Sequence, residues 1–268
     1  MKGCIKMLQI KTTAGEATYE TRGDNEAPTL VLFHTLLADC SVYDGIIDRL
    51  AENFCVTRFN FPGYGGSTGE CNSIDDYADW TAAFFQALRL SDEKKPISVF
   101  SNGFGGFVSL GLCLRHPALV SHLIIANSGG AFPDERKVPL HGMAQKVRND
   151  GISAVLDIAM SRMFPDLFRK ENPEIISERK NKLLTADPLQ FAKACEALSK
   201  LDYLSQVNKI SCEVDIIAGM QDETTPPSMS NALYEKIDQA NYHEITDSGH
   251  CPQIQQPEKL LSLILGIL

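Results

Sequence analysis

A buried strand, a glycine-containing turn and an apolar helix follow one another in residues 97–117, "ISVFSNGFGGFVSLGLCLRHP". The first four residues are nearly all apolar, as expected of a strand that is covered on both faces. The predicted helix, 104–116, is apolar nearly all round, which is typical of a helix at the centre of a fold. Small residues at Ser101 and Gly105 let a strand and a helix cross closely. The stretch therefore predicts a sharp, crowded turn whose tip is Gly103.

Strands and helices alternate along most of the chain. Apolar or alternating runs predict strands at 29–34, 55–61, 119–128 and 213–219, and "MLQIKT" with "ATYETRG" predicts an N-terminal hairpin. Helical patterns lie between or after these strands, at 42–54, 73–90, 104–116, 229–237 and 257–268. This order predicts an α/β fold with a doubly wound, mostly parallel sheet.

The alternation stops between residues 132 and 206, where we find no convincing core strand. Three helical segments, 143–164, 171–186 and 188–201, occupy this part of the chain. We therefore predict that 132–206 is a helical cap inserted into a core made of 1–131 and 207–268. A single domain with an insertion fits this pattern better than two independent domains.

Composition narrows the classes of partner. The net charge of −9 argues against nucleic acid, whose backbone such a chain would repel. No apolar run reaches the length of a membrane span, and the first residues lack a signal-peptide pattern. The eight cysteines, Cys4 among them, have irregular spacing, which favours reduced thiols in a cytoplasmic protein. The sequence does not specify the oligomeric state, and a homodimer stays open.

Five motifs resemble the α/β-hydrolase family over nearly the whole chain. They are "VLFHTLLADCSVYD", similar to the family's oxyanion loop, "RFNFPGYGGS", "VFSNGFGG" at the nucleophile turn, "IIAGMQDETTPP" at the triad acid and "DSGHCPQIQQPEKL" at the catalytic histidine. The cap sequence looks most like that of 3-oxoadipate enol-lactonases, which hydrolyse a small anionic lactone. "SNGFGG" is also similar to a motif of carbon–carbon bond hydrolases that act on ring-cleavage products. The resemblance implies an eight-stranded sheet.

The resemblance assigns roles to particular residues. It makes His250 the general base and Asp222 the acid that orients it, with Glu223 as the alternative acid. The backbone N–H groups of Leu36 and Phe104 would form the oxyanion hole. The alternative is that Asp222 caps a turn and that the two N–H groups belong to an ordinary turn and a helix start.

Two residues depart from the family pattern. Thr35 stands where glycine is usual and crowds the oxyanion loop, and Gly103 stands where the nucleophilic serine is usual. Taking Ser101 as the nucleophile would put Val99 and Gly103 at the flanking positions and place the serine before the turn, so we do not favour it.

Three hypotheses follow for the function. The first is an α/β-hydrolase of a small lactone, ester or ring-cleavage substrate whose serine is missing at Gly103, either by descent or by an engineered serine-to-glycine change. The second is a native non-covalent chemistry, in which His250 activates water or serves a lyase, isomerase or decarboxylase. The third is a catalytically silent protein that binds a small-molecule ligand. We rank them in this order.

Further residues complete the predicted site. Thr35 and Asn102 are assigned to substrate binding, and Arg136, Arg162 and Lys137 lie in or near the cap, where they could bind a substrate carboxylate or simply be solvated. "GFGG" lacks the third glycine of a dinucleotide fingerprint, and no cluster has metal-ligand spacing. We therefore expect neither cofactor nor metal.

Overall fold

The computed structural model describes residues 7–90 and 97–268, so Cys4 lies outside the described residues. Its eight-stranded sheet has the order β1-β2-β4-β3-β5-β6-β7-β8. The strands are β1 (Leu8–Thr12), β2 (Gly15–Arg22), β3 (Thr29–Phe33), β4 (Cys55–Phe59), β5 (Ile97–Asn102), β6 (His122–Ala126), β7 (Glu213–Gly219) and β8 (Asn241–Ile245). The pairs β1–β2 and β2–β4 are antiparallel, so the N-terminal hairpin runs against β4, while the five other pairs are parallel. The predicted doubly wound, mostly parallel sheet is confirmed.

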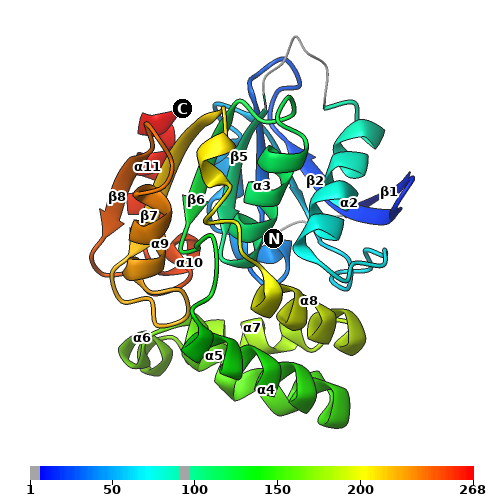
Figure 1. The fold of residues 1–268 in the computed structure, drawn as a ribbon, viewed down its shortest axis with the longest axis vertical. Helices are drawn as coiled ribbons and strands as arrows, with labels where there is room; N and C mark the ends of the chain where they lie inside the picture. The colour runs from blue at the N-terminus through cyan, green and yellow to red at the C-terminus, as the bar shows by residue number, and fades with distance from the viewer. Residues whose placement is uncertain (1–6, 91–96) are drawn as a thin grey trace.

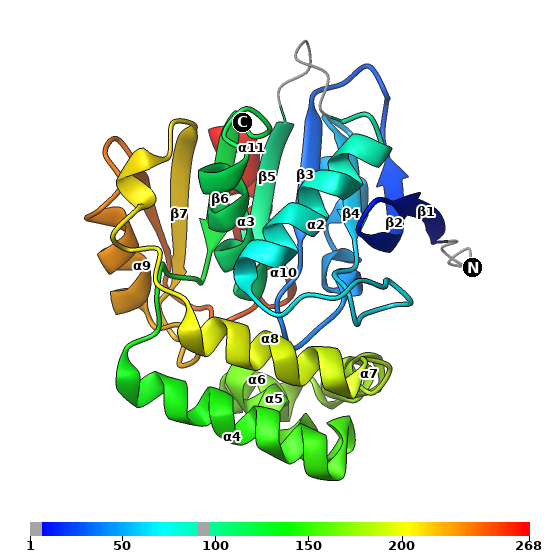
Figure 2. The same ribbon diagram turned by 45° about the vertical axis from the view of Figure 1, so that its right-hand side comes forward.

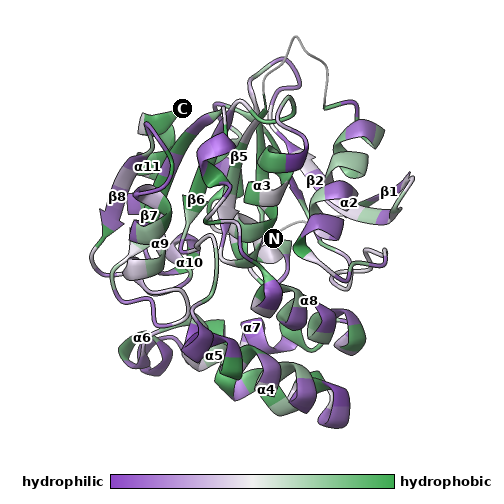
Figure 3. Ribbon diagram, in the orientation of Figure 1, coloured by the Kyte–Doolittle hydropathy of each residue, from purple (hydrophilic) through white to green (hydrophobic). Residues whose placement is uncertain are grey.

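Helices cover both faces of the sheet (Figures 1 and 2). The helices α2 (Ile74–Ala87), α3 (Phe104–Arg115) and α9 (Pro227–Tyr234) lie on one face, and α1 (Ile47–Leu50) and α11 (Pro257–Ile267) lie on the other. The central strands β5 and β6 are mainly hydrophobic, as the colouring of Figure 3 shows. β3 and β4 are buried at every position, which explains the apolar run of β3. In β4 the buried Arg58 is paired with Glu20 at 2.6 Å.

Two helical predictions differ from the structure. The segment 42–54 was expected to be one helix, but it holds only the end of a 3-10 turn, Cys40–Tyr43, and the four residues of α1. The segment 143–164 was also expected to be continuous. Gly151, at φ 78°, instead ends one helix before a 3-10 turn leads into the next. A positive φ is easy for glycine and ends regular helix geometry.

Five helices connect β6 to β7 and lie together beyond the carboxyl ends of the central strands (Figures 1 and 2). They are α4 (Asp134–Asp150), α5 (Leu156–Met163), α6 (Asp166–Glu171), α7 (Pro173–Leu183) and α8 (Pro188–Lys200). The short helix α10 (Pro252–Gln255) comes later, after β8. A β-bridge between Ala131 and Asp202 joins the two ends of this helical segment. Among the described residues, none of the helices is long and apolar enough to cross a bilayer.

Candidate active site

A buried carboxylate and a buried imidazole form the centre of the site. His250 Nδ1 lies 2.8 Å from Asp222 Oδ2, and the two residues are only 2% and 3% exposed. Asp222 Oδ1 accepts hydrogen bonds from the N–H groups of Thr224 and Thr225, and Oδ2 accepts one from the Thr225 hydroxyl. Because the carboxylate is an acceptor, the proton of the neutral ring lies on Nδ1 and the lone pair on Nε2. The imidazole is thus oriented as a base.

Gly103 lies at the tip of the turn between β5 and α3, beside His250. Its backbone, at φ 54° and ψ −115°, is in a region that strains any residue with a side chain. A Cβ on Gly105 would come within 2.6 Å of the Phe33 carbonyl oxygen, and one on Gly106 within 2.5 Å of the Ser128 hydroxyl. The close crossing expected from small residues is therefore present. The same crossing leaves no room for larger side chains.

Ser101, the alternative nucleophile, is fully buried in β5. Its hydroxyl donates to the Ile124 carbonyl and accepts from Ser109, and the residue is absent from the cavity wall. It therefore has a structural role in the core.

The Thr35 hydroxyl lies 3.0 Å from His250 Nε2, where it donates to the free lone pair of the ring. A Cβ built on Gly103 would fall 2.5 Å from that hydroxyl oxygen. The sequence assigned Thr35 to crowding of the oxyanion loop and to substrate contact. In the structure its hydroxyl occupies the space that a side chain at position 103 would need. The sequence contained one indication of this: both Thr35 and Gly103 depart from the family pattern.

Residues 34–38 are held in place by buried hydrogen bonds. His34 Nδ1 donates to the Thr35 carbonyl at 2.8 Å, and its Nε2 accepts from the Phe61 N–H at 3.0 Å. Complete burial lowers the pKa of His34 to about 4, so the ring is neutral near pH 7 and braces the loop. The Tyr64 hydroxyl donates to the Leu36 carbonyl, which fixes the orientation of the following peptide.

Two backbone N–H groups beside Gly103 are available to a ligand. Leu36 and Phe104 both line the cavity, and within residues 7–90 and 97–268 neither N–H donates to a protein acceptor. Phe104 is the first residue of α3, where the helix dipole adds partial positive charge. These are the two donors that the sequence assigned to an oxyanion hole.

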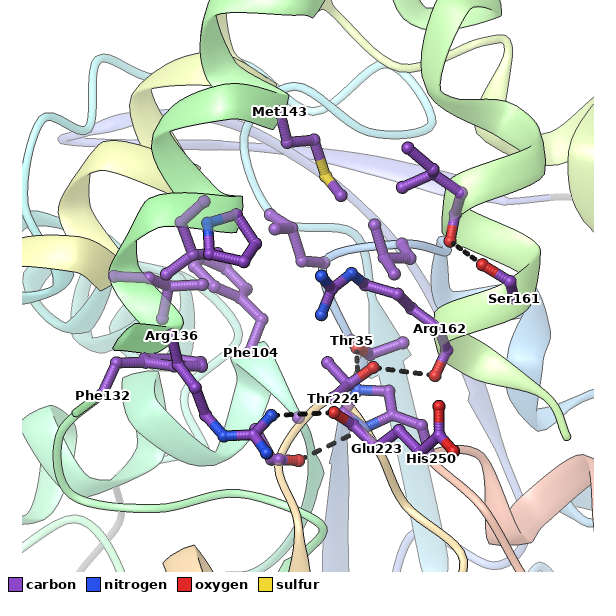
Figure 4. A pocket seen from close by; sticks show the side chains of 18 of the residues that line it. Thr35, Phe104, Phe132, Arg136, Met143, Ser161, Arg162, Glu223, Thr224 and His250 are labelled. Atoms are coloured by element: carbon purple, nitrogen blue, oxygen red, sulfur yellow. Dashed lines mark hydrogen bonds between the residues drawn. The ribbon is translucent and has the colours of Figure 1, made fainter. Parts of the chain in front are cut away.

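A cavity of about 590 Å³ lies between this centre and the helices α4, α5 and α8 (Figure 4). Thr35, Gly103 and His250 lie at its base. Apolar side chains form much of its wall: Leu37, Phe107, Phe132, Pro139, Leu140, Met143, Ile158 and Leu198. No sequence pattern identified these residues as a group, because only the tertiary structure brings them to one wall.

Arginines at the cavity differ in their partners. Arg136 donates to the Glu223 carbonyl at 2.9 Å, whereas no side-chain or carbonyl partner of the Arg162 guanidinium is found among the described residues. Figure 4 shows that this guanidinium points into the cavity. Burial lowers the pKa of Arg162, the positive charge of Arg136 lowers it further, and the negative charge of Glu223 opposes the two. Lys137 instead pairs with Asp134 outside the cavity, and Glu223 makes no contact with His250.

Asn102 requires a correction. It was assigned to substrate binding, but it is fully buried and does not line the cavity. Its amide N–H₂ donates to the His250 carbonyl at 2.9 Å, and its oxygen accepts from Gln253 at 3.0 Å. The side chain therefore anchors the histidine loop from behind, because the strand pleat turns it away from the cavity.

The model of the α/β hydrolase fold matches residues 28–257, so the chain belongs to this family. That match includes four of the five motifs on which the resemblance was based, and the fifth, at 247–260, as far as residue 257.

Relatives with established names are distant. The chain is 25% identical over 243 residues to 3-oxoadipate enol-lactonase 2 of Acinetobacter baylyi, covering 90% of this chain and 88% of the relative. It is 23% identical to a pimeloyl-[acyl-carrier protein] methyl ester esterase of Nitrosomonas europaea, covering 91% and 96%. The crystal structure of the enol-lactonase from Burkholderia xenovorans superposes with a TM-score of 0.89 at 21% identity, covering 97% and 98% of the two chains. The fold is thus shared closely.

Proposed function

We propose that this chain hydrolyses a small ester or lactone that carries a carboxylate. The observation that carries the proposal is the oriented Asp222–His250 pair, whose imidazole lines the cavity. A base of this kind serves to accept a proton from an attacking hydroxyl group. The enol-lactonase and ester-hydrolase relatives support lactone or ester cleavage as the reaction.

The carbonyl chemistry would use the two available amides. When a hydroxyl adds to an ester or lactone carbonyl, negative charge develops on the carbonyl oxygen. The N–H groups of Leu36 and Phe104 can donate to that oxygen, since neither has a protein acceptor among the described residues. Donors held in advance at such a position stabilise the transition state more than the substrate.

The carboxylate is assigned to Arg162. A half-buried guanidinium without a protein partner in the described chain favours a negatively charged ligand. The nearby charge of Arg136 adds to this preference, because an anion between the two arginines would relieve their repulsion. The apolar wall would contact the carbon chain of the substrate.

Two esters of equal chain length test the proposal. We expect mono-p-nitrophenyl adipate to be hydrolysed with a higher kcat/KM than p-nitrophenyl hexanoate, which lacks the second carboxylate. Arg162→Gln should raise the KM for the adipate ester by about tenfold or more, since a charged hydrogen bond is lost, and should change the hexanoate ester little. Lys137→Gln is the matched control, because Lys137 lies outside the cavity.

His250→Gln tests the base itself. We expect it to lower kcat by about 10²-fold or more for both esters. Unchanged turnover in His250→Gln would contradict the proposal. So would a wild-type chain that hydrolyses neither ester.

A further inference from the structure

Two departures from the family pattern occupy the same place in space. Gly103 lacks the side chain that normally fills the tip of the turn, and Thr35 adds a side chain to a loop position where glycine is usual. A Cβ at Gly103 would lie 2.5 Å from Thr35 Oγ1 and 2.6 Å from His250 Nε2. Such distances are too short for atoms that are not bonded. The Thr35 hydroxyl therefore fills the space that a side chain at position 103 would need.

The hydrogen bonds around that hydroxyl form a directed chain. The Asp222 carboxylate accepts the Nδ1 proton of His250, and this leaves the Nε2 lone pair to accept from Thr35 Oγ1 at 3.0 Å. A hydroxyl, an imidazole and a carboxylate connected in this order are the parts of a nucleophilic triad, which is recognised by geometry and not by sequence position. Figure 4 shows the Thr35 hydroxyl directed at the imidazole of His250.

The hydroxyl is also next to the space where a substrate would lie. Thr35, Gly103 and His250 all line the cavity, and Gly103 has no side chain to cover the Thr35 hydroxyl. Leu36 and Phe104, whose N–H groups have no protein acceptor among the described residues, also line this cavity. A carbonyl group bound there would meet a hydroxyl, its base and two N–H donors.

We propose that Thr35 is the catalytic nucleophile, an inference that rests on the ester or lactone hydrolysis proposed above. Thr35 Oγ1 forms a bond to the substrate carbonyl carbon while its proton passes to His250 Nε2. The tetrahedral intermediate then breaks the bond to the leaving oxygen, which takes the proton from His250, and an acyl-Thr35 ester remains. Water adds to this ester, its proton passes to His250, and breaking the acyl bond returns the proton to Thr35 Oγ1. The sum is ester plus water to acid plus alcohol.

Matched substitutions at Thr35 separate this mechanism from activation of water by His250. Thr35→Val keeps the shape of the side chain and removes the hydroxyl, whereas Thr35→Ser keeps the hydroxyl. We expect Thr35→Val to lower the kcat for mono-p-nitrophenyl adipate by about 10³-fold or more, by comparison with other nucleophile losses. Thr35→Ser should stay within about tenfold of the wild-type rate, as expected when the hydroxyl is what matters.

The covalent intermediate gives a second readout. Acid quenching during turnover, followed by peptide mass spectrometry, should find the adipyl group on Thr35 in the wild-type chain and on no residue of His250→Gln. Circular dichroism and binding of free adipate will show whether Thr35→Val is folded with its cavity intact. If that variant is unfolded, the acyl-peptide result and Thr35→Ser decide the question.

The outcomes distinguish the two proposals. Turnover that needs His250 but persists in a folded Thr35→Val, or an acyl group on a residue other than Thr35, would overturn the nucleophile assignment and leave the hydrolysis in place. No turnover and no acyl group in the wild-type chain would overturn the proposed function and the nucleophile with it.

Discussion

Placing a serine at the turn should cost more stability when Thr35 is present than when Thr35 is replaced by glycine. In Gly103→Ser the new Cβ lies 2.5 Å from Thr35 Oγ1 and 2.6 Å from His250 Nε2, so both side chains must shift. Forcing extra atoms into a packed site costs about 1–3 kcal/mol. The backbone at φ 54° and ψ −115° adds about 1–3 kcal/mol of strain for a residue with a side chain.

Thr35→Gly removes the overlap with Thr35 Oγ1 but neither the overlap with His250 Nε2 nor the backbone strain. The double variant Gly103→Ser/Thr35→Gly should therefore be more stable than the sum of the single changes predicts, by about 1–3 kcal/mol, which is the overpacking that Thr35 causes. Urea unfolding followed by circular dichroism on the four chains measures this coupling energy. Additivity within about 0.5 kcal/mol would refute the claim that the two positions share one space.

Alanine at the turn supplies the control. Gly103→Ala carries the same Cβ without a hydroxyl, so Gly103→Ala/Thr35→Gly should show the same coupling in stability. Only the serine double variant presents a hydroxyl to His250 without Thr35, so ester hydrolysis should be measurable there and lost in the alanine pair. Equal activity in the two double variants would show that neither hydroxyl is the nucleophile.

Other expected results concern residues around the centre. Because His34 titrates at 6.5 in the unfolded chain but near 4 when buried, the unfolded state binds more protons between these values, and stability should fall by about 2 kcal/mol from pH 7 to pH 5, a difference that His34→Gln should reduce in urea titrations. Asn102→Ala should lower the free energy of unfolding by about 1–3 kcal/mol, since the His250 carbonyl loses its donor, and leave KM unchanged in ester assays. Ser101→Ala should leave kcat unchanged, and a large loss would reinstate it as a nucleophile candidate.

The sheet and the polar centre could be predicted because their signals are local. Continuous apolar runs identified the buried strands, and the motifs containing Gly103, Asp222 and His250 placed these residues at the ends of strands that a parallel sheet brings to one edge. The start of α2 was equally readable. Ser73 and Asp76 make both hydrogen bonds of a capping box, as their spacing predicts.

The helices near the cavity were harder to predict from sequence, because each of them packs on one side only. α4 begins at Asp134, well before the predicted start at 143. Only Met143, Ala144 and Val147 of this helix are buried. So few apolar contacts produce no periodic pattern in its first turns, and Pro139 inside the helix argues against helix from sequence. The same limit applies to the cavity wall, which consists of residues from separate helices that only tertiary structure brings together.

The centre of the site shows why a motif should be assessed by the atoms it delivers and not by the residue type at one position. Judged by position, this chain has lost its nucleophile, because Gly103 offers no side chain. Judged by geometry, a hydroxyl still donates to His250 Nε2 while Asp222 holds the other nitrogen, and the hydroxyl belongs to a residue 215 positions away in the sequence. A rotamer of Thr35 decides this contact, and no pattern of residue types specifies a rotamer. Glycine at the turn and threonine in the loop are each unfavourable to the usual mechanism, yet together they conserve both the packing and the hydrogen bond.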